Sequence, residues 1–224
     1  MGEIEAVAAG EREDIYRFLS GLYLRPPSDP LLEMILDGGI TTVFRDDEEM
    51  SAFVKAASGM ANIKDELEAE HASLFVLPSG VIPHEAVYLD KEKRLGGRVT
   101  MGVRQFYERA GTELSEACLE MPDHIGMELE FLGLLCKLER ELRGGDDRSS
   151  LLKCIELQKT FLGEHISQWG YSCCEEVVKH AVYGFYKAVA RFTMKFLKSE
   201  EEYVSGLYEK ACREGEQLCG TAKN

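Results

Sequence analysis

A carboxylate and an imidazole stand next to each other where a long helix is expected to begin. Asp123 and His124 follow Pro122, and apolar residues then recur at three- and four-residue spacing until Gly144-Gly145. This pattern favours Asp123 as the residue that caps the helix, with His124 as a hydrogen-bonded neighbour. A cap contributes only about 1 kcal/mol. An Asp123→Ala, His124→Ala double variant is therefore expected to stay folded.

A metal site at this position is the alternative interpretation. Glu120 and Glu128 lie four residues before and after His124, so all three would share one face of a helix that extended back to Glu120. Two carboxylates and one imidazole are a small ligand set, and no second histidine is close in the sequence. A structural cap is favoured over a metal, and no metal or other cofactor is expected.

The other candidates for catalysis are isolated in the sequence. The seven cysteines include the vicinal pair Cys173-Cys174 but no Cys-x-x-Cys motif, and only one Glu-x-x-His sequence occurs where a di-iron bundle requires two. Phosphate-binding glycine motifs are missing from the sequence. We therefore do not expect an enzyme. A small helical metal-binding or redox-sensing protein that uses His124, His165 or the cysteines is the alternative.

Charge and composition narrow the class of partner. The 224 residues include 40 acidic and 26 basic side chains, which gives a net charge of −14. Such a negative field repels phosphate backbones and anionic headgroups, so no nucleic-acid partner is expected. No apolar run approaches the ~20 residues that span a bilayer, so no stable membrane insertion is expected either. The first residues are acidic, whereas a secretory signal peptide begins with basic ones, so a cytoplasmic protein is expected. The odd number of cysteines then indicates reduced thiols.

The elements that position these residues are predicted to be helices, so the expected class is all-α. Apolar side chains at helical spacing predict helices at residues 15–23, 31–36, 53–57, 63–75, 103–110, 123–142, 151–169, 175–197 and 203–224. Residues 78–97 are predicted to be a long loop. Gly170 is predicted to end the helix before it. We expect one globular, bundle-like domain over residues 1–224, with two lobes joined near 113–121 as the alternative arrangement.

Several short motifs carry a family resemblance. The Glu-x-x-Asp-His sequence at 120–124 resembles the signature of the TorD/DmsD/NarJ family of redox-enzyme maturation chaperones. Further segments similar to the family's motifs follow the family's order: Leu74-Phe75 ahead of Pro78, the loop Pro83-His84-Glu85-Ala86-Val87-Tyr88, the run from Pro122 to Leu132, the run from Phe161 through His165 to Trp169, and Phe185-Tyr186. Two departures from the family pattern are His71 in place of an aromatic residue and Ala86 in place of serine.

The resemblance implies a cytoplasmic chaperone, monomeric or homodimeric, rather than an enzyme. Its partners would be the apo-form of a molybdenum oxidoreductase subunit and the twin-arginine signal peptide of that subunit, held while the cofactor is inserted and before export. An apolar groove would take the hydrophobic part of the peptide, and carboxylates would receive its arginines with marked salt sensitivity. The residues expected to contact the client are Leu74, Phe75, Glu85, Tyr88, Glu120, Asp123, His124 and Trp169.

Overall fold

The computed structural model describes residues 2–45, 47–113 and 119–221, and side chains within 5–214 of these ranges. The elements are α1 (Gly2–Leu24), α2 (Asp29–Leu36), the 3₁₀ turn η1 (Gly39–Thr42), α3 (Glu48–Ala57), α4 (Ile63–His71), the π-helical turn η2 (Ala72–Val76), α5 (Glu85–Leu89), α6 (Arg98–Arg109), α7 (Ile125–Arg143), α8 (Arg148–Phe161), the π-helical turn η3 (Leu162–Ile166), α9 (Ser167–His180) and α10 (Gly184–Thr221). These ranges contain no strand, so the predicted all-α class is confirmed.

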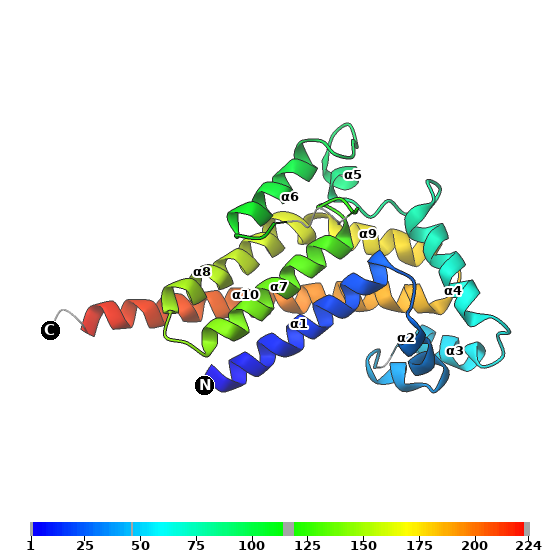
Figure 1. Cartoon of the computed structure of the whole chain (residues 1–224), viewed down its shortest axis with the longest axis horizontal. Helices are drawn as coiled ribbons and strands as arrows, with labels where there is room; N and C mark the ends of the chain where they lie inside the picture. Colours follow the sequence, from blue (N-terminus) through cyan, green and yellow to red (C-terminus); the bar gives the residue numbers. More distant parts are fainter. Residues whose placement is uncertain (1, 46, 114–118, 222–224) are drawn as a thin grey trace.

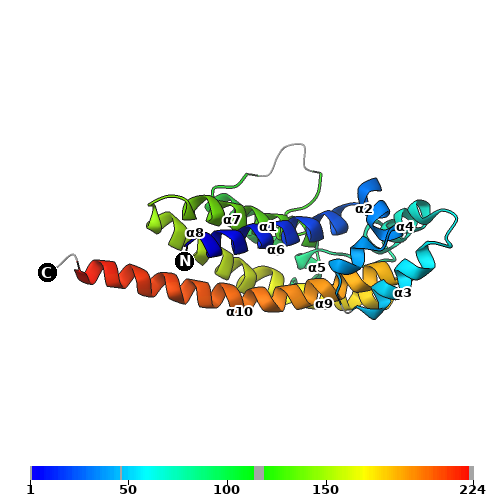
Figure 2. The same cartoon turned by 90° about the horizontal axis from the view of Figure 1, so that it is seen from below.

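The long helices form a bundle around one core. α1 and α7 lie side by side and make the most extensive contact of any two elements (Figure 1). α10 runs along the opposite side, where it packs on α8, α9 and α3 (Figure 2). The sequence pattern had predicted two helices at 175–197 and 203–224, but α10 is one continuous helix from Gly184 to Thr221. None of the described helices is long and apolar enough to cross a bilayer.

Aromatic side chains fix α6 on the bundle. The Tyr107 ring lies 4.4 Å from the Phe131 ring of α7, and the Phe106 ring lies 5.1 Å from the Phe161 ring of α8. All four residues are buried. Burying side chains of this size contributes about 1.5–3 kcal/mol each, and edge-to-face pairing adds to it. α6 therefore has a defined position relative to the start of α7.

A short helix interrupts the segment predicted to be a loop. α5 begins at Glu85, and its first two amides have distant acceptors: the amide of Glu85 donates to the Asp123 carbonyl at 2.9 Å, and the amide of Ala86 donates to Asp123 Oδ2 at 3.1 Å. These contacts satisfy amide groups that a helix start leaves unpaired. The prediction of an unbroken loop over 78–97 was wrong because the stabilising partner is remote in the sequence.

The boundary between α9 and α10 also differs from the prediction. Gly170 lies inside α9 and does not end a helix. The chain leaves the helical path at Ala181, whose ψ is 134°. Here the buried Glu70 side chain accepts hydrogen bonds from the amides of Val182 at 2.6 Å and Tyr183 at 2.7 Å. A side chain from α4 thus sets this break, and local sequence signals do not report it. The predicted lobe boundary near 113–121 falls mainly on residues 114–118, outside the described ranges, and stays a prediction.

Candidate functional site

The residues predicted to carry chemistry meet where the start of α5 approaches the start of α7. His84 and His124 form an isolated antiparallel bridge. The amide of Ile125 donates to the Pro83 carbonyl at 2.8 Å, so the two segments are tied on both sides of the histidines. The imidazole rings meet edge to face with their centroids 5.1 Å apart. This bridge brings together two motifs that are about 40 residues apart in the sequence.

Asp123 is fully buried and accepts several hydrogen bonds. Its Oδ2 accepts from the amide of Ala86 at 3.1 Å and from the Thr100 hydroxyl at 3.0 Å, while Oδ1 lies 3.6 Å from His84 Nδ1. Burial alone would raise the pKa of Asp123, but His84, Ala86 and Thr100 outweigh it and hold the pKa below its usual range. Asp123 is therefore an ionised carboxylate that joins α5, α6 and the start of α7.

The residue that caps α7 is His124. It occupies the N-cap position, and its Nδ1 accepts a hydrogen bond from the amide of Gly126 at 3.0 Å. Burial, and then the neighbouring His84, lower the pKa of His124 to about 3, so this imidazole is neutral at physiological pH. The prediction that Asp123 caps this helix was wrong, because the Asp123 side chain turns toward α5 instead.

A second histidine, His84, lies beside His124 and makes it necessary to ask again whether this site can bind a metal ion. The ligand atoms of His84, Glu120 and His124 lie within 4.8 Å of one another, and the bridge supplies the histidine that the sequence seemed to lack. The capping bond argues against metal binding, however. A neutral imidazole that accepts at Nδ1 carries its proton on Nε2, so His124 has no free lone pair to offer. The arrangement fits a hydrogen-bond donor better than a metal ligand.

Glu120 is the carboxylate of this site that reaches solvent. Its side chain is 40% exposed, and its Oε1 lies 3.8 Å from His84 Nε2 and accepts from the amide of Met121 at 3.0 Å. Because α7 begins only at Ile125, Glu120 does not share a helix face with His124 as the sequence pattern suggested. Glu120 and His124 instead lie together because both are next to His84, which forms the bridge to His124.

A second layer of buried acids lies behind this surface. Glu85 accepts from His165 Nδ1 at 3.1 Å, and Trp169 Nε1 donates to Glu128 Oε2 at 3.2 Å. Burial first, and then the adjacent Glu85 carboxylate, raise the pKa of Glu128 well above its usual range. Glu128 is therefore protonated and shares a hydrogen bond with Glu85, while the π-helical turn η3 precedes Trp169 and carries His165.

The predicted aromatic and apolar contacts divide between this layer and the core. Tyr88 is half-buried, with its ring 5.4 Å from that of the buried Trp169. Leu74 is buried, and the Phe75 ring packs 5.5 Å from Tyr23 and 5.6 Å from Tyr186. Their contacts give Leu74 and Phe75 a packing role, and a direct part in client binding stays a prediction.

Exposed apolar side chains lie on the segments that lead into the site, and they were not among the predicted contacts. Leu119 precedes Glu120 and is fully exposed, and Ile82 lies two residues before His84 with 39% exposure. Leu77 is exposed at the end of η2. Helical periodicity could not identify them, because all three lie outside α-helices. The signal available in the sequence was their position inside or beside the family-like motifs.

The protonated state of Glu128 leads to a prediction about stability. The folded protein retains a proton that a glutamate with the ordinary pKa of 4.5 releases, so Glu128 favours folding below that pH and loses this effect as pH rises toward its raised pKa. Glu128→Gln keeps the hydrogen bonds without the titration. We expect the variant to exceed the wild type in unfolding free energy by about 1–3 kcal/mol at pH 7.5.

Urea unfolding at several pH values, followed by the fluorescence of Trp169, measures this difference, because the sequence contains a single tryptophan. The difference should disappear below about pH 4.5. Glu128→Ala is the control for lost packing and should be less stable than the wild type at every pH. Parallel pH profiles for Glu128→Gln and the wild type would contradict a protonated Glu128.

Comparisons with known proteins identify the family of this chain. The family described as nitrate reductase delta subunit matches residues 45–175, which include every residue of the site, and the chain belongs to this family. Two relatives are the chaperone protein TorD of Vibrio vulnificus strain YJ016, 26% identical over 92% of this chain and 100% of the relative, and that of Vibrio cholerae serotype O1 strain ATCC 39315, 23% identical over 89% and 94%. The predicted resemblance to the TorD/DmsD/NarJ family is confirmed.

A solved structure, described as a redox enzyme maturation protein from Archaeoglobus fulgidus, is also similar to this chain. It is 23% identical and covers 68% of this chain and 90% of its own, with a TM-score of 0.38.

Proposed function

We propose that this protein is a chaperone for a molybdenum oxidoreductase, acting in the cytoplasm on the apo-form and on its twin-arginine signal peptide. The observation that carries the proposal is the exposed Glu120 carboxylate, which lies beside two histidines and next to exposed apolar side chains. The matched relatives are named chaperones, which supports a binding rather than a catalytic role. This site needs no bond-making residue.

In this proposal Glu120 binds the arginines of the signal peptide. A carboxylate can accept two parallel hydrogen bonds from one guanidinium, which supplies orientation as well as energy. Glu85 and Asp123 were predicted to share this task, but both are buried and already accept internal hydrogen bonds. In our proposal they hold the surface in shape together with His124, which is equally buried and caps α7.

Apolar recognition falls to side chains around the same surface. Leu119, Ile82 and Leu77 expose apolar area that an isolated chain gains nothing by exposing. Covering them with the hydrophobic stretch of a signal peptide would contribute about 25 cal/mol for each Å² removed from water. The peptide would thus be held by one charged and one apolar contact.

An ion pair between Glu120 and an arginine of the peptide suits a contact that must later be released. Attraction between Glu120 and arginine is screened by salt, because the carboxylate is partly exposed. A net charge of −14 adds a long-range attraction for a cationic peptide and speeds its association. Moderate affinity with fast exchange is what a proofreading factor requires.

Glu120→Gln is the variant that tests the charged contact. Titration calorimetry with a synthetic twin-arginine signal peptide is expected to show about tenfold weaker binding at low salt, equal to about 1.4 kcal/mol. The loss should shrink in high salt, because screening already weakens the wild-type contact. The matched control is Glu130→Gln, which removes the same charge from an exposed position on α7 and should change the affinity less than twofold.

Two results would count against this proposal. Equal weakening by Glu120→Gln and Glu130→Gln would show that only the overall charge matters. Stoichiometric zinc or nickel in the purified protein, lost in a His84→Ala variant, would favour the metal-binding alternative instead.

A further inference from the structure

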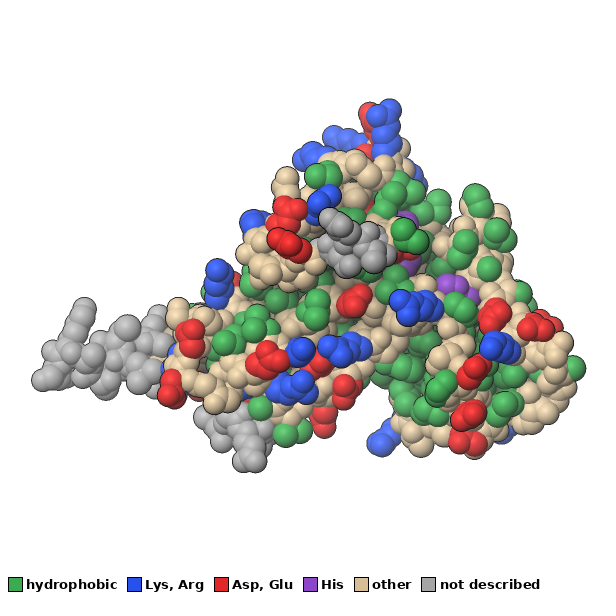
Figure 3. Space-filling model, in the orientation of Figure 1, with side chains coloured by type: hydrophobic (Ala, Val, Ile, Leu, Met, Phe, Trp, Pro, Cys, Tyr) green, Lys and Arg blue, Asp and Glu red, His purple; other side chains and the backbone are tan. Residues whose placement is uncertain are grey.

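One region of this acidic protein has the opposite charge. Residues 91–109, which cover nearly all of the α5–α6 connection and the whole of α6, contain six basic and two acidic side chains, although the whole chain has 26 basic and 40 acidic ones. Basic side chains gather over the α5 and α6 end of the molecule in Figure 3. The charges of the chain are thus separated in space, with a basic end on an acidic body.

Only part of this basic charge is neutralised within the described structure. Arg94 Nε lies 2.9 Å from Glu92 Oε2, and Arg104 Nε lies 3.1 Å from Glu108 Oε1. Four exposed cations have no ion-pair partner among the described residues: Lys91, Lys93, Arg98 and Arg109. A soluble surface gains nothing from keeping like charges together, because they repel one another. Unpaired cations concentrated at one end fit an anionic partner.

The outer face of α6 is also hollowed. Two adjoining cavities of about 350 and 600 Å³ share Gly102, Gln105 and His165 as lining residues. Arg98 lines the first cavity and Arg109 the second. The two arginines are eleven residues apart, which corresponds to about 16 Å along a helix. The result is a shallow cleft with Gly102 and Gln105 on its floor and a guanidinium at each end, and the carboxylates of Glu85 and Glu108 also line it.

The floor of the cleft leaves room for a main chain. A Cβ atom added at Gly102 would have no neighbour within 4 Å, so no other described residue covers the helix there. His165 forms the wall, held in place by its bond to Glu85 and by stacking on the Phe161 ring at 4.8 Å. Because this wall is fixed, the cleft is preformed rather than created by a partner.

We propose that this cleft binds an acidic segment of a partner polypeptide, with carboxylates of the segment on Arg98 and Arg109. The spacing of about 16 Å suits two acidic side chains on one peptide. A nucleic acid would fit less well, because its closely spaced phosphates would also meet the Glu85 and Glu108 carboxylates that line the cavities, whereas a peptide can carry its acidic side chains at the two arginines alone. This surface is separate from Glu120, so the inference goes beyond the signal-peptide contact.

Fluorescence anisotropy with a labelled peptide of alternating glutamate and alanine tests the inference on the full chain. The wild type should bind this peptide at low salt, and Arg98→Glu, Arg109→Glu should weaken binding at least tenfold. Arg45→Glu, at an exposed position outside α6, is the control for a single charge reversal and should change binding less than twofold, whereas Arg98→Glu or Arg109→Glu alone should weaken it about threefold. Neither set of variants should weaken binding of the twin-arginine peptide, which distinguishes this surface from the Glu120 contact.

Four outcomes would overturn the proposal. The first is no binding of the acidic peptide by the wild type at low salt. The second is that Arg45→Glu weakens binding as much as Arg98→Glu or Arg109→Glu alone, which would show a non-specific charge effect. The third is tighter binding of a labelled uridine oligonucleotide than of the peptide, since the occupant would then be a nucleic acid. The fourth is a dimer in sedimentation that Arg98→Glu, Arg109→Glu dissociates, since the occupant would then be a second copy of the chain.

Discussion

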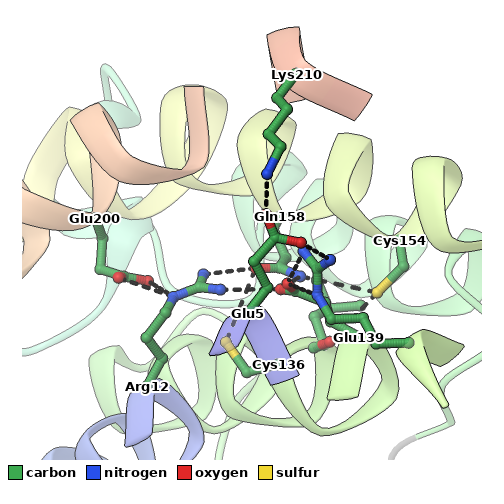
Figure 4. A network of polar contacts seen from close by, with 10 residues as sticks. Glu5, Arg12, Cys136, Glu139, Cys154, Gln158, Glu200 and Lys210 are labelled. Carbon is green, nitrogen blue, oxygen red and sulfur yellow. Dashed lines mark hydrogen bonds and ion pairs between the residues drawn. The ribbon is translucent and has the colours of Figure 1, made fainter. Parts of the chain in front are cut away.

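Arg12→Met is expected to lower the free energy of unfolding by about 3–5 kcal/mol. Arg12 is buried among three helices other than its own (Figure 4). Its Nε donates to Glu200 at 2.8 and 2.9 Å, Nη1 donates to Glu139 at 2.9 Å, and Nη2 donates to Gln158 at 2.6 Å. Methionine fills similar space but removes the cation that Glu139 and Glu200 share, and uncompensated buried charge is costly.

The same network explains why the loss should not be larger. Arg143 also pairs with Glu139 at 2.7 Å, so one of the two acids keeps a cation when Arg12 is removed. Glu200 has no such second partner among the described ion pairs. Burial already raises the pKa of Glu200 with Arg12 present. In the variant we expect Glu200 to take up a proton rather than remain charged.

Urea unfolding of Arg12→Met beside Arg17→Met measures this effect. Arg17 pairs with Glu13 at 3.0 Å, but its side chain is 52% exposed, so the control should lose less than about 1 kcal/mol. Adding Glu200→Gln to Arg12→Met should restore part of the stability, because the orphaned acid is then replaced by a neutral group. Similar losses of unfolding free energy for Arg12→Met and Arg17→Met would show that the buried network stabilises the fold no more than an exposed ion pair does.

The helix ends set by local chemistry could be predicted from the sequence. α1 ends at Leu24, just before Pro26 and Pro27, where a ring without an amide donor cannot continue the helix. α6 ends before Gly111, whose φ of +78° is readily adopted by glycine. In both cases the signal and the structure it determines lie within a few residues of each other.

The features that were missed depend on partners remote in the sequence. No local sequence signal marks Arg12, because its partners lie 127 to 188 residues further on. His84 was recognised only as part of a motif, since its approach to His124 requires the bridge between the starts of α5 and α7. Hydrophobic periodicity reports which face of a helix is buried, but not which polar groups meet there.

Asp123→Ala is expected to destabilise the domain by about 3 kcal/mol, more than the 1 kcal/mol expected for a simple helix cap. The substitution removes the acceptor of the Ala86 amide and of the Thr100 hydroxyl, and both donors are buried with it. Each buried donor left without a partner costs about 1–3 kcal/mol. The start of α5 should therefore loosen, and His84 and Glu85 with it.

Asp123→Asn separates this structural role from a direct role in binding. The amide oxygen of asparagine can accept the same two hydrogen bonds, so we expect this variant to melt within about 1 kcal/mol of the wild type. Because Asp123 is fully buried, its charge does not reach a ligand directly. Asparagine should then keep signal-peptide affinity within threefold and support activity of the client oxidoreductase, while alanine weakens both through the loss of α5. If a stably folded Asp123→Asn variant loses the peptide, the buried charge itself takes part in recognition, and Glu120 is not the main receptor for the arginines.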